Sequence, residues 1–183
     1  LDARTLPTTL LWTGGGLTSA FDDADNWTAS DSPIHRVPVG GDDVYFKSPG
    51  SGGSNKDCTG LGIVYPGGSY PNFTYNLNSI HLVDGYAGTL TLEDAQIVTD
   101  LELASGAIAQ PDEHGGTEIT VHGEFTWTGG VLNSDATPSQ LIVVGGEATI
   151  EPHGTTLTTN NTIRLAVVPY LAYASSGTIR YGT

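Results

Sequence analysis

Short runs of alternating apolar and polar residues follow one another along residues 76–183, and glycines separate these runs. Alternation places every second side chain on the same face of an extended strand, so runs such as residues 88–92 and 119–121 predict β-strands. Residues 1–75 have a different pattern, with six of the ten prolines and a glycine- and serine-rich run at residues 48–54. We therefore expect an N-terminal cap with an irregular β segment over residues 1–75 and a regular strand-rich region over residues 76–183.

The strand-rich region repeats itself every 23 or 24 residues. Four glycines are separated by 24, 24 and 23 residues: Gly106, Gly130, Gly154 and Gly177. Residues 119–127 also match residues 142–150 position by position, which aligns Val121 with Val144. A fixed period of this length indicates a solenoid, because ~23 residues at roughly 3.3 Å each hold about three short strands and tight corners.

The sequence therefore predicts an all-β fold, a right-handed parallel β-helix (β-solenoid), with about four to five coils of 23–24 residues over residues 76–183. Inward side chains such as Phe125 and Trp127 would stack from coil to coil, and glycines would occupy corners where a side chain has no room. The alternative is an antiparallel β-sandwich, which also has short strands at regular spacing. A sandwich does not require matching residues to recur at a fixed interval.

Composition and charge exclude several classes of protein. Glycine accounts for 25 residues and only 14% of the residues are charged, which excludes an all-helical protein. The net charge is −14, and neither lysine nor arginine occurs between Lys56 and Arg164. Nucleic acids and anionic lipids need a basic surface, so the candidate partners are a cation, a neutral polysaccharide or a protein. No apolar stretch approaches the roughly 18 residues of a membrane span, so we expect no membrane insertion.

Several features predict an extracellular or cell-surface location. The chain starts at Leu1 and contains no methionine, which indicates a processed start or a piece of a longer chain. The composition is acidic, rich in threonine and poor in lysine, as is typical of extracellular proteins. Asn26, Asn72 and Asn160 match the N-glycosylation pattern. Cys58 is the single cysteine, so we expect a buried small residue, with a cross-chain bridge as the alternative.

Several short segments of the sequence, the phrases given next, resemble those of bacterial secreted β-helical repeat proteins. These are surface proteins and autotransporter-passenger-like proteins. The phrases are GYAGTLTL (residues 85–92), FTWTGGVLN (125–133), WTGG (12–15), DNW (25–27), Pro38 and GGDDVYF (40–46). This resemblance covers about two-thirds of the chain. It implies secretion and a structural or adhesive role, and it carries over no catalytic residue.

The two ends of the expected solenoid differ. An open coil exposes unpaired backbone groups and its apolar interior, so we expect Trp12 and Trp27 to cover the first coil, with a sugar-stacking platform as the alternative role. The last residues, with Ile179 and Tyr181, read as the start of another coil. This predicts a homo-oligomer formed by end-to-end stacking, which becomes a filament when the head-to-tail contact does not close.

Carboxylates are the best candidates for a binding site. In the repeat alignment Asp100, Glu124 and Glu147 lie above one another on an outward face, where Ca²⁺ would find oxygen ligands; the alternative is a solvated acidic face. The acidic run at residues 22–26 lacks the glycine and the distal glutamate of an EF-hand loop. Turns formed by Asp and Asn side chains explain this run about as well as calcium binding does. The five histidines have no metal-ligand spacing. Calcium is therefore the one cofactor considered.

The sequence contains no nucleophile elbow, phosphate-binding loop or dinucleotide-binding fingerprint, so we predict neither catalytic nor cofactor-binding residues. Glu124 and Glu147 would form the carboxylate pair of a polysaccharide-cleaving enzyme, and residues 112–114 an acid–base group. We predict instead an extracellular structural protein that self-assembles head to tail as a filament, surface-layer or adhesin subunit. The alternatives are a carbohydrate-binding module and a polysaccharide-degrading β-helix enzyme, which would bind a glycan.

Overall fold

The computed structural model describes the chain in nine segments: residues 8–30, 35–61, 76–93, 96–110, 118–134, 141–151, 158–159, 162–165 and 179–181. These segments contain strands, turns and loops but no α-helix, and two short 3₁₀ helices, η1 (Ala24–Asn26) and η2 (Pro49–Ser51). Some residues named in the sequence predictions lie outside the described residues: Asn72, residues 112–114, Gly154, Asn160 and Gly177.

The described strands form three sheets. The eight-stranded sheet, in the order β17–β14–β11–β8–β5–β3–β1–β2, contains β1 (Thr9–Trp12), β2 (Trp27–Ala29), β3 (Asp43–Phe46), β5 (Ser79–Leu82), β8 (Asp100–Leu103), β11 (Glu124–Trp127), β14 (Glu147–Ile150) and β17 (Ile179–Tyr181). The five-stranded sheet, in the order β15–β12–β9–β6–β4, contains β4 (Cys58–Leu61), β6 (Thr89–Leu92), β9 (Ala107–Gln110), β12 (Val131–Ser134) and β15 (Thr158–Thr159). The four-stranded sheet, in the order β16–β13–β10–β7, contains β7 (Gln96–Val98), β10 (Glu118–Val121), β13 (Leu141–Val144) and β16 (Thr162–Leu165).

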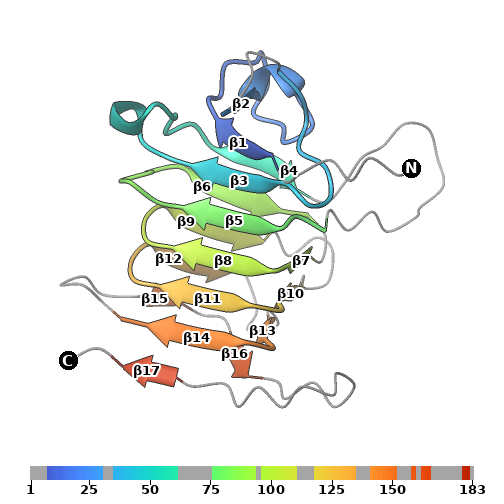
Figure 1. The fold of residues 1–183 in the computed structure, drawn as a ribbon. Helices are drawn as coiled ribbons and strands as arrows, with labels where there is room; N and C mark the ends of the chain where they lie inside the picture. The colour runs from blue at the N-terminus through green and yellow to red at the C-terminus, as the bar shows by residue number, and fades with distance from the viewer. Residues whose placement is uncertain are drawn as a thin grey trace, which may run out of the picture.

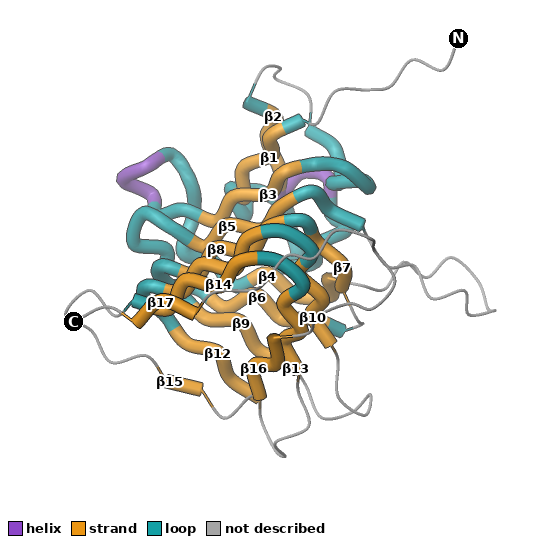
Figure 2. Tube along the Cα trace, turned by 60° about the horizontal axis from the view of Figure 1, so that its bottom comes forward, coloured by secondary structure: helices purple, strands orange, loops and turns teal. Residues whose placement is uncertain are grey.

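The chain visits the three sheets in turn. From β5 it passes to β6 in the five-stranded sheet and to β7 in the four-stranded sheet, and it then returns as β8, which pairs with β5. The same order recurs from β8 to β11 and from β11 to β14. Figure 1 shows the resulting pile of strands, and Figure 2 shows the successive passes of the chain lying over one another.

The strand pairing is parallel for every described pair of named strands except β1 with β2. The predicted alignment of the repeats is confirmed, because Val121 faces Val144 and Phe125 faces Ala148 in the parallel ladders. The mostly β architecture with parallel sheets is confirmed as well. The antiparallel sandwich is wrong, because the strands that match in sequence lie side by side and run in the same direction.

One apolar core runs through the described part of the chain, from Leu10 to Ala148. The inward residues of each strand supply it, since buried and partly exposed residues alternate along strands such as β6 and β8. Phe125 and Trp127 belong to this core, at 0% and 3% exposure, as predicted. Among the described residues the indole nitrogen of Trp127 has no hydrogen-bond partner, which sets this ring apart from the other two tryptophans.

Aromatic rings fill the core beside β1 and β2. Trp12 and Trp27 meet edge to face with ring centroids 5.1 Å apart, and Phe21 and Phe46 pack against Trp27 at 5.0 and 5.6 Å. Both tryptophans are fully buried. Their packing at this end of the core agrees with the expectation that they cover the first pass of the chain. A sugar-stacking platform on these two rings is wrong, because neither ring presents a face to solvent.

The parallel sheets begin before residue 76. Strand β3 pairs with β5 and strand β4 pairs with β6, although β3 and β4 both precede that residue. The composition changes near residue 76, but the pairing does not. The part that departs from parallel pairing is the segment up to residue 30, where β2 turns back against β1.

Glycines recur at the corners because a side chain has no space there. A Cβ atom at Gly146 would overlap the carbonyl group of Gly123, which lies one pass earlier in the chain. A Cβ atom at Gly129 would overlap the carbonyl group of Ala104 in the same way. Of the glycines in the repeat series, Gly106 and Gly130 are described, and a Cβ atom at Gly130 would lie 2.7 Å from the Gly106 carbonyl oxygen, so their 24-residue spacing reflects the close approach of successive corners.

Candidate functional site

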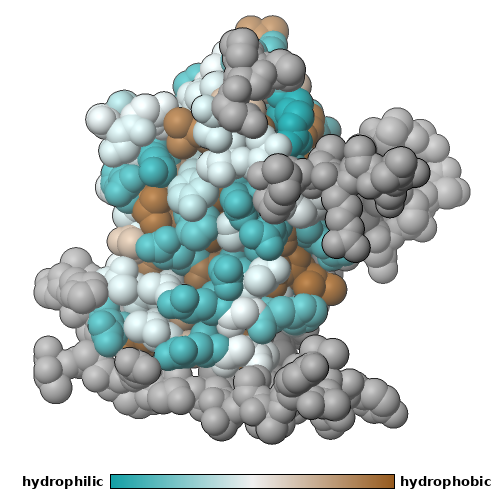
Figure 3. Space-filling model, viewed as in Figure 1, coloured by the Kyte–Doolittle hydropathy of each residue, from teal (hydrophilic) through white to brown (hydrophobic). Residues whose placement is uncertain are grey.

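Five carboxylates lie on the outward side of the eight-stranded sheet: Asp43, Asp100, Glu102, Glu124 and Glu147. We call this side the acidic face. The carboxylates alternate with inward residues such as Val44 and Leu101, which are buried. The register places Glu124 beside Glu147. Figure 3, which views the molecule as Figure 1 does, shows mainly hydrophilic and neutral residues on its described surface.

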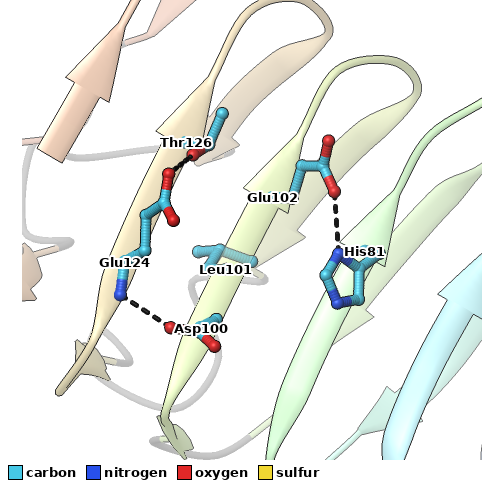
Figure 4. Close-up of a pocket in the computed structure, with 6 residues that line it drawn as sticks. All are labelled: His81, Asp100, Leu101, Glu102, Glu124 and Thr126. Atoms are coloured by element: carbon cyan, nitrogen blue, oxygen red, sulfur yellow. Dashed lines mark hydrogen bonds and ion pairs between the residues drawn. The ribbon is translucent and has the colours of Figure 1, made fainter. Parts of the chain in front are cut away.

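A hollow of ≈ 310 Å³ lies on the acidic face (Figure 4). The residues that line it are His81, Asp100, Leu101, Glu102, Glu124 and Thr126. They come from β5, β8 and β11, three neighbouring strands of the sheet. Three carboxylates, an imidazole and a hydroxyl group make this lining polar. Most of the polar side-chain atoms in it are hydrogen-bond acceptors.

A chain of hydrogen bonds connects one side of this hollow to β3. His81 Nδ1 lies 2.8 Å from Glu102 Oε2, and His81 Nε2 lies 2.9 Å from Ser79 Oγ. Ser79 donates its hydroxyl hydrogen to Asp43 Oδ1 at 2.6 Å. Because a hydroxyl group has one hydrogen, which Ser79 gives to Asp43, the Ser79 oxygen is left as the acceptor toward His81 Nε2.

Tyr45 supports this histidine from β3. The phenol ring stacks on the imidazole with centroids 4.2 Å apart and an interplanar angle of 9°. Lys47 Nζ lies 5.1 Å from the centroid of the phenol ring. Desolvation raises the pKa of Tyr45, and the nearby charges of Asp43 and Glu102 add to the rise, while Lys47 opposes it. The phenol therefore stays neutral over the physiological range and acts as a packing surface.

The Ser79–His81–Glu102 arrangement has the order of a catalytic triad but not its chemistry. A nucleophilic serine gives its hydrogen to the histidine and faces the substrate. Ser79 is 3% exposed, and its hydrogen goes to Asp43 rather than to His81. The arrangement therefore ties β3, β5 and β8 together. No sequence pattern indicates it, because the His81–Glu102 and Ser79–Asp43 pairs are 21 and 36 residues apart, outside the period of the repeat.

The predicted calcium ladder is present as a row on the acidic face. The backbone N–H of Glu124 donates to Asp100 Oδ1 at 2.7 Å, and Thr126 donates its hydroxyl hydrogen to Glu124 Oε1 at 2.8 Å. Within the described residues, no three histidine, cysteine or acidic side chains are grouped so that they could hold a metal ion. Calcium binding by Asp100, Glu124 and Glu147 thus stays a prediction from the repeat alignment.

The acidic run at residues 22–26 forms an Asx turn. Asp23 caps η1 by accepting a hydrogen bond from the Asp25 backbone N–H at 3.1 Å, and it also accepts one from the Thr18 hydroxyl at 2.9 Å. The Thr18 hydrogen bond is the main cause that lowers the pKa of Asp23. Of the two readings left open for this run, turn chemistry is the one the contacts support.

Two single residues have clear outcomes. Cys58 is fully buried in the core, which agrees with a buried small residue, and desolvation raises the pKa of its thiol. Asn26 is also fully buried, and its amide nitrogen donates to the carbonyl groups of Thr18 and Ala20. The expectation of a glycan on Asn26 is therefore wrong for the folded chain, because the nitrogen that would carry the sugar has no access to solvent.

The remaining predicted residues are placed only in part. Glu124 and Glu147 are neighbours in the parallel ladder, but the hollow brings Glu124 together with Asp100 and Glu102 instead. The backbone of Ile179 and Tyr181 forms β17, which pairs with β14. The side chains of β17 lie outside the described residues.

Comparison with known proteins leaves the family of this chain open. No family model matches the sequence, no curated protein matches it, and no solved structure matches the fold. Among the described residues, no helix has the length and apolar character needed to cross a membrane.

Proposed function

We propose that this chain is a right-handed β-solenoid that serves as a structural segment of an extracellular assembly. The observation that carries the proposal is the cyclic order of strands through three parallel sheets, with matching residues side by side at each pass. Each pass buries its apolar residues against the previous and the next pass, so such a structure grows along one direction. Stiffness along that direction is what a filament, surface layer or adhesin requires.

The two ends of the sheets support different roles in such an assembly. At one end β2 runs antiparallel to β1 and closes the eight-stranded sheet. At the other end β15, β16 and β17 are the outermost described strands of the three sheets. We infer that the solenoid is extended from the β15–β17 end, by further coils or by a second copy. Head-to-tail stacking also needs access to the β1 end, which β2 covers.

The electrostatics support a protein or glycan partner outside the cell. The acidic face carries five carboxylates; His81 bonds to one of them, Glu102, and Lys47 lies over the Tyr45 ring at the margin of the face. Such a face repels phosphate-bearing partners. A net charge of −14 also keeps copies apart in solution, except where specific strand pairing overcomes the repulsion.

The test combines sedimentation with site-specific labelling of the intact chain. Leu17 lies in the loop before β2 and is fully exposed, and Thr149 lies on β14 near the other end. Each is replaced by cysteine in turn; Cys58 is buried and does not compete for the label. We expect association that rises with concentration and joins the β15–β17 ends of two copies, so that position 149 becomes protected and position 17 does not. Monomers at every concentration would overturn the proposal, as would protection of neither position.

The hollow on the acidic face favours a second candidate function, the binding of a neutral or amino sugar. Its lining offers several acceptors for sugar hydroxyl groups, and Asp100, Glu102 and Glu124 would repel a uronate. A glycan array with Glu124→Gln as the test variant addresses this candidate. Glu93→Gln is the matched control, because Glu93 follows β6 and lies outside the hollow. Binding that the control keeps and the test variant loses supports the site.

A further inference from the structure

One segment of the chain closes two sheets at the same end. Residues 13–30, the closing segment, begin directly after β1 and include β2, which covers the outer edge of β1 in the eight-stranded sheet. The same segment covers the edge of β4 in the five-stranded sheet. There the Phe21 backbone N–H donates to the Thr59 carbonyl at 2.7 Å, and the Thr59 N–H donates to the Ser19 carbonyl at 2.8 Å.

Asn26 holds the closing segment in shape. Its side-chain oxygen accepts a hydrogen bond from the Gly16 backbone N–H at 2.9 Å. Its amide nitrogen donates to the carbonyl groups of Thr18 and Ala20 at 3.0 and 2.9 Å. The side chain is fully buried, and both amide hydrogens form hydrogen bonds with the segment that covers β4. Loss of this amide would leave buried backbone groups without their partner, which is costly.

Other side chains fasten the closing segment to the aromatic core. The indole of Trp27 donates to the Phe21 carbonyl at 2.8 Å, and the indole of Trp12 donates to the Lys56 carbonyl at 3.0 Å. The hydroxyl of Thr18 donates to Asp23 at 2.9 Å. These polar contacts add to the burial of the Phe21 and Trp27 rings and to the short antiparallel pairing of β2 with β1, which replaces the parallel ladders of the rest of the eight-stranded sheet.

The edges under the closing segment match the opposite ends of the same sheets. Parallel strand edges present regular N–H and C=O groups that accept another strand, and a short strand of opposite direction blocks this addition. The eight-stranded sheet has β17 at its other end, and the five-stranded sheet has β15 there. A second copy of the chain carries strands of matching direction in both sheets at once, which makes it the partner that fits both edges.

We propose that the closing segment is an autoinhibitory cap on head-to-tail self-association: its release from β1 and β4 opens both edges to the β17 and β15 strands of a second copy. This inference rests on the proposed structural role and adds its regulation. The exposed carboxylates Asp22 and Asp25 lie on the cap itself. They raise the repulsion toward an acidic second copy as long as the cap is closed.

Asn26→Ala is the main test, with Asn76→Ala as the matched control, because Asn76 is exposed and lies away from the cap. Hydrogen exchange of the Phe21 and Thr59 amides should become at least about tenfold faster in Asn26→Ala, while the amides of β8 and β11 keep their protection. The same variant should form concentration-dependent chains in sedimentation and electron microscopy. A cysteine label at position 11 should become protected in these chains, because Leu11 lies on β1, the edge that the released cap opens.

Three outcomes would overturn the inference. They are unchanged exchange at Phe21 and Thr59, open edges in a chain that does not gain protection at position 11, and association that Asn76→Ala shares. Should Asn26→Ala unfold throughout, Thr18→Ala decides in its place. Thr18 is exposed, so this variant loosens the cap without touching the core. A failure of the structural proposal can be told apart from a failure of this inference, because in that case the label at position 149 of the unmodified chain would stay unprotected at every concentration.

Discussion

The closing segment and the repeated part of the chain are stabilised in different ways. The closing segment combines the buried rings of Phe21 and Trp27 with single polar contacts, such as those of Asn26 and the Trp27 indole. The repeated part, from β7 to β14, depends on parallel backbone ladders, on stacked apolar residues and on corners without side chains. The closing segment is therefore specified by particular residues. The repeated part is specified by a pattern of residue types, within which one residue can replace another of the same type.

The largest expected effects come from the two regions' large aromatic residues. Trp27→Ala and Trp127→Ala should each lower the free energy of unfolding by about 3–5 kcal/mol, because each side chain is at most 3% exposed. The two variants should differ in which part of the structure loses protection. Trp27→Ala should first expose the amides of the closing segment to hydrogen exchange, whereas Trp127→Ala should lower protection throughout. Chemical denaturation gives the total, and a loss below about 1 kcal/mol at either site would contradict its burial.

Corner glycines test the repeated part alone. Gly146→Ala should lower the free energy of unfolding by about 1–3 kcal/mol, since its Cβ would meet the Gly123 carbonyl group and the backbone has to move. Gly40→Ala is the control, because its Cβ would find its nearest neighbour, the Asn76 carbonyl oxygen, at an ordinary 3.6 Å. Equal thermal melting temperatures for these two variants would mean that the corners are not in contact.

A smaller effect separates the tryptophans by their hydrogen bonds. Trp27→Phe removes a hydrogen bond to the Phe21 carbonyl, whereas Trp127→Phe removes none within the described part of the chain, where the Trp127 indole nitrogen has no partner. Both substitutions lose similar ring volume. Trp27→Phe should therefore be the more costly by about 1 kcal/mol in denaturant titrations. The reverse order would show that the polar contacts of the closing segment contribute little.

The smallest effect concerns pH and the closing segment. Hydrogen bonding, chiefly from Thr18, lowers the pKa of Asp23 below its ordinary 3.8. Its folded-state pKa is thus the lower one, so its contribution to stability is present above the ordinary value and is lost as the pH falls through the folded-state value. The closing segment should loosen in that acidic range. Melting curves should show a smaller acid effect in Thr18→Ala than in the unmodified chain, and equal effects would refute this role of Asp23.

The comparison of the two regions also explains what the sequence alone could predict. The parallel pairing of Val121 with Val144 and the corner positions of the glycines followed from a period of 23 to 24 residues. Periodicity is a signal that a single sequence carries, because each pass meets the same packing requirement. The cap role of Trp12 and Trp27 followed from the need to cover an open end.

Contacts between residues outside the period left no such signal. Asn26 matched a glycosylation pattern, yet its amide is buried and bonded to Thr18 and Ala20. His81 had no metal-ligand spacing, yet the fold places it between Ser79 and Glu102. These contacts depend on how loops of particular length return to the sheets, which neither alternation nor spacing specifies.

The central claim is that successive passes of the chain add one strand at a time to the same sheet. Spin labels on one outward row measure this most directly: Leu11, Tyr45, His81, Glu102, Thr126 and Thr149 are successive Cα partners. At about 4.8 Å per strand, Leu11 to Thr126 should span about 19 Å and Leu11 to Thr149 about 24 Å. Electron–electron distance measurements should show that increment of about 5 Å. Equal distances for the two pairs, or a shorter one to Thr149, would contradict the account.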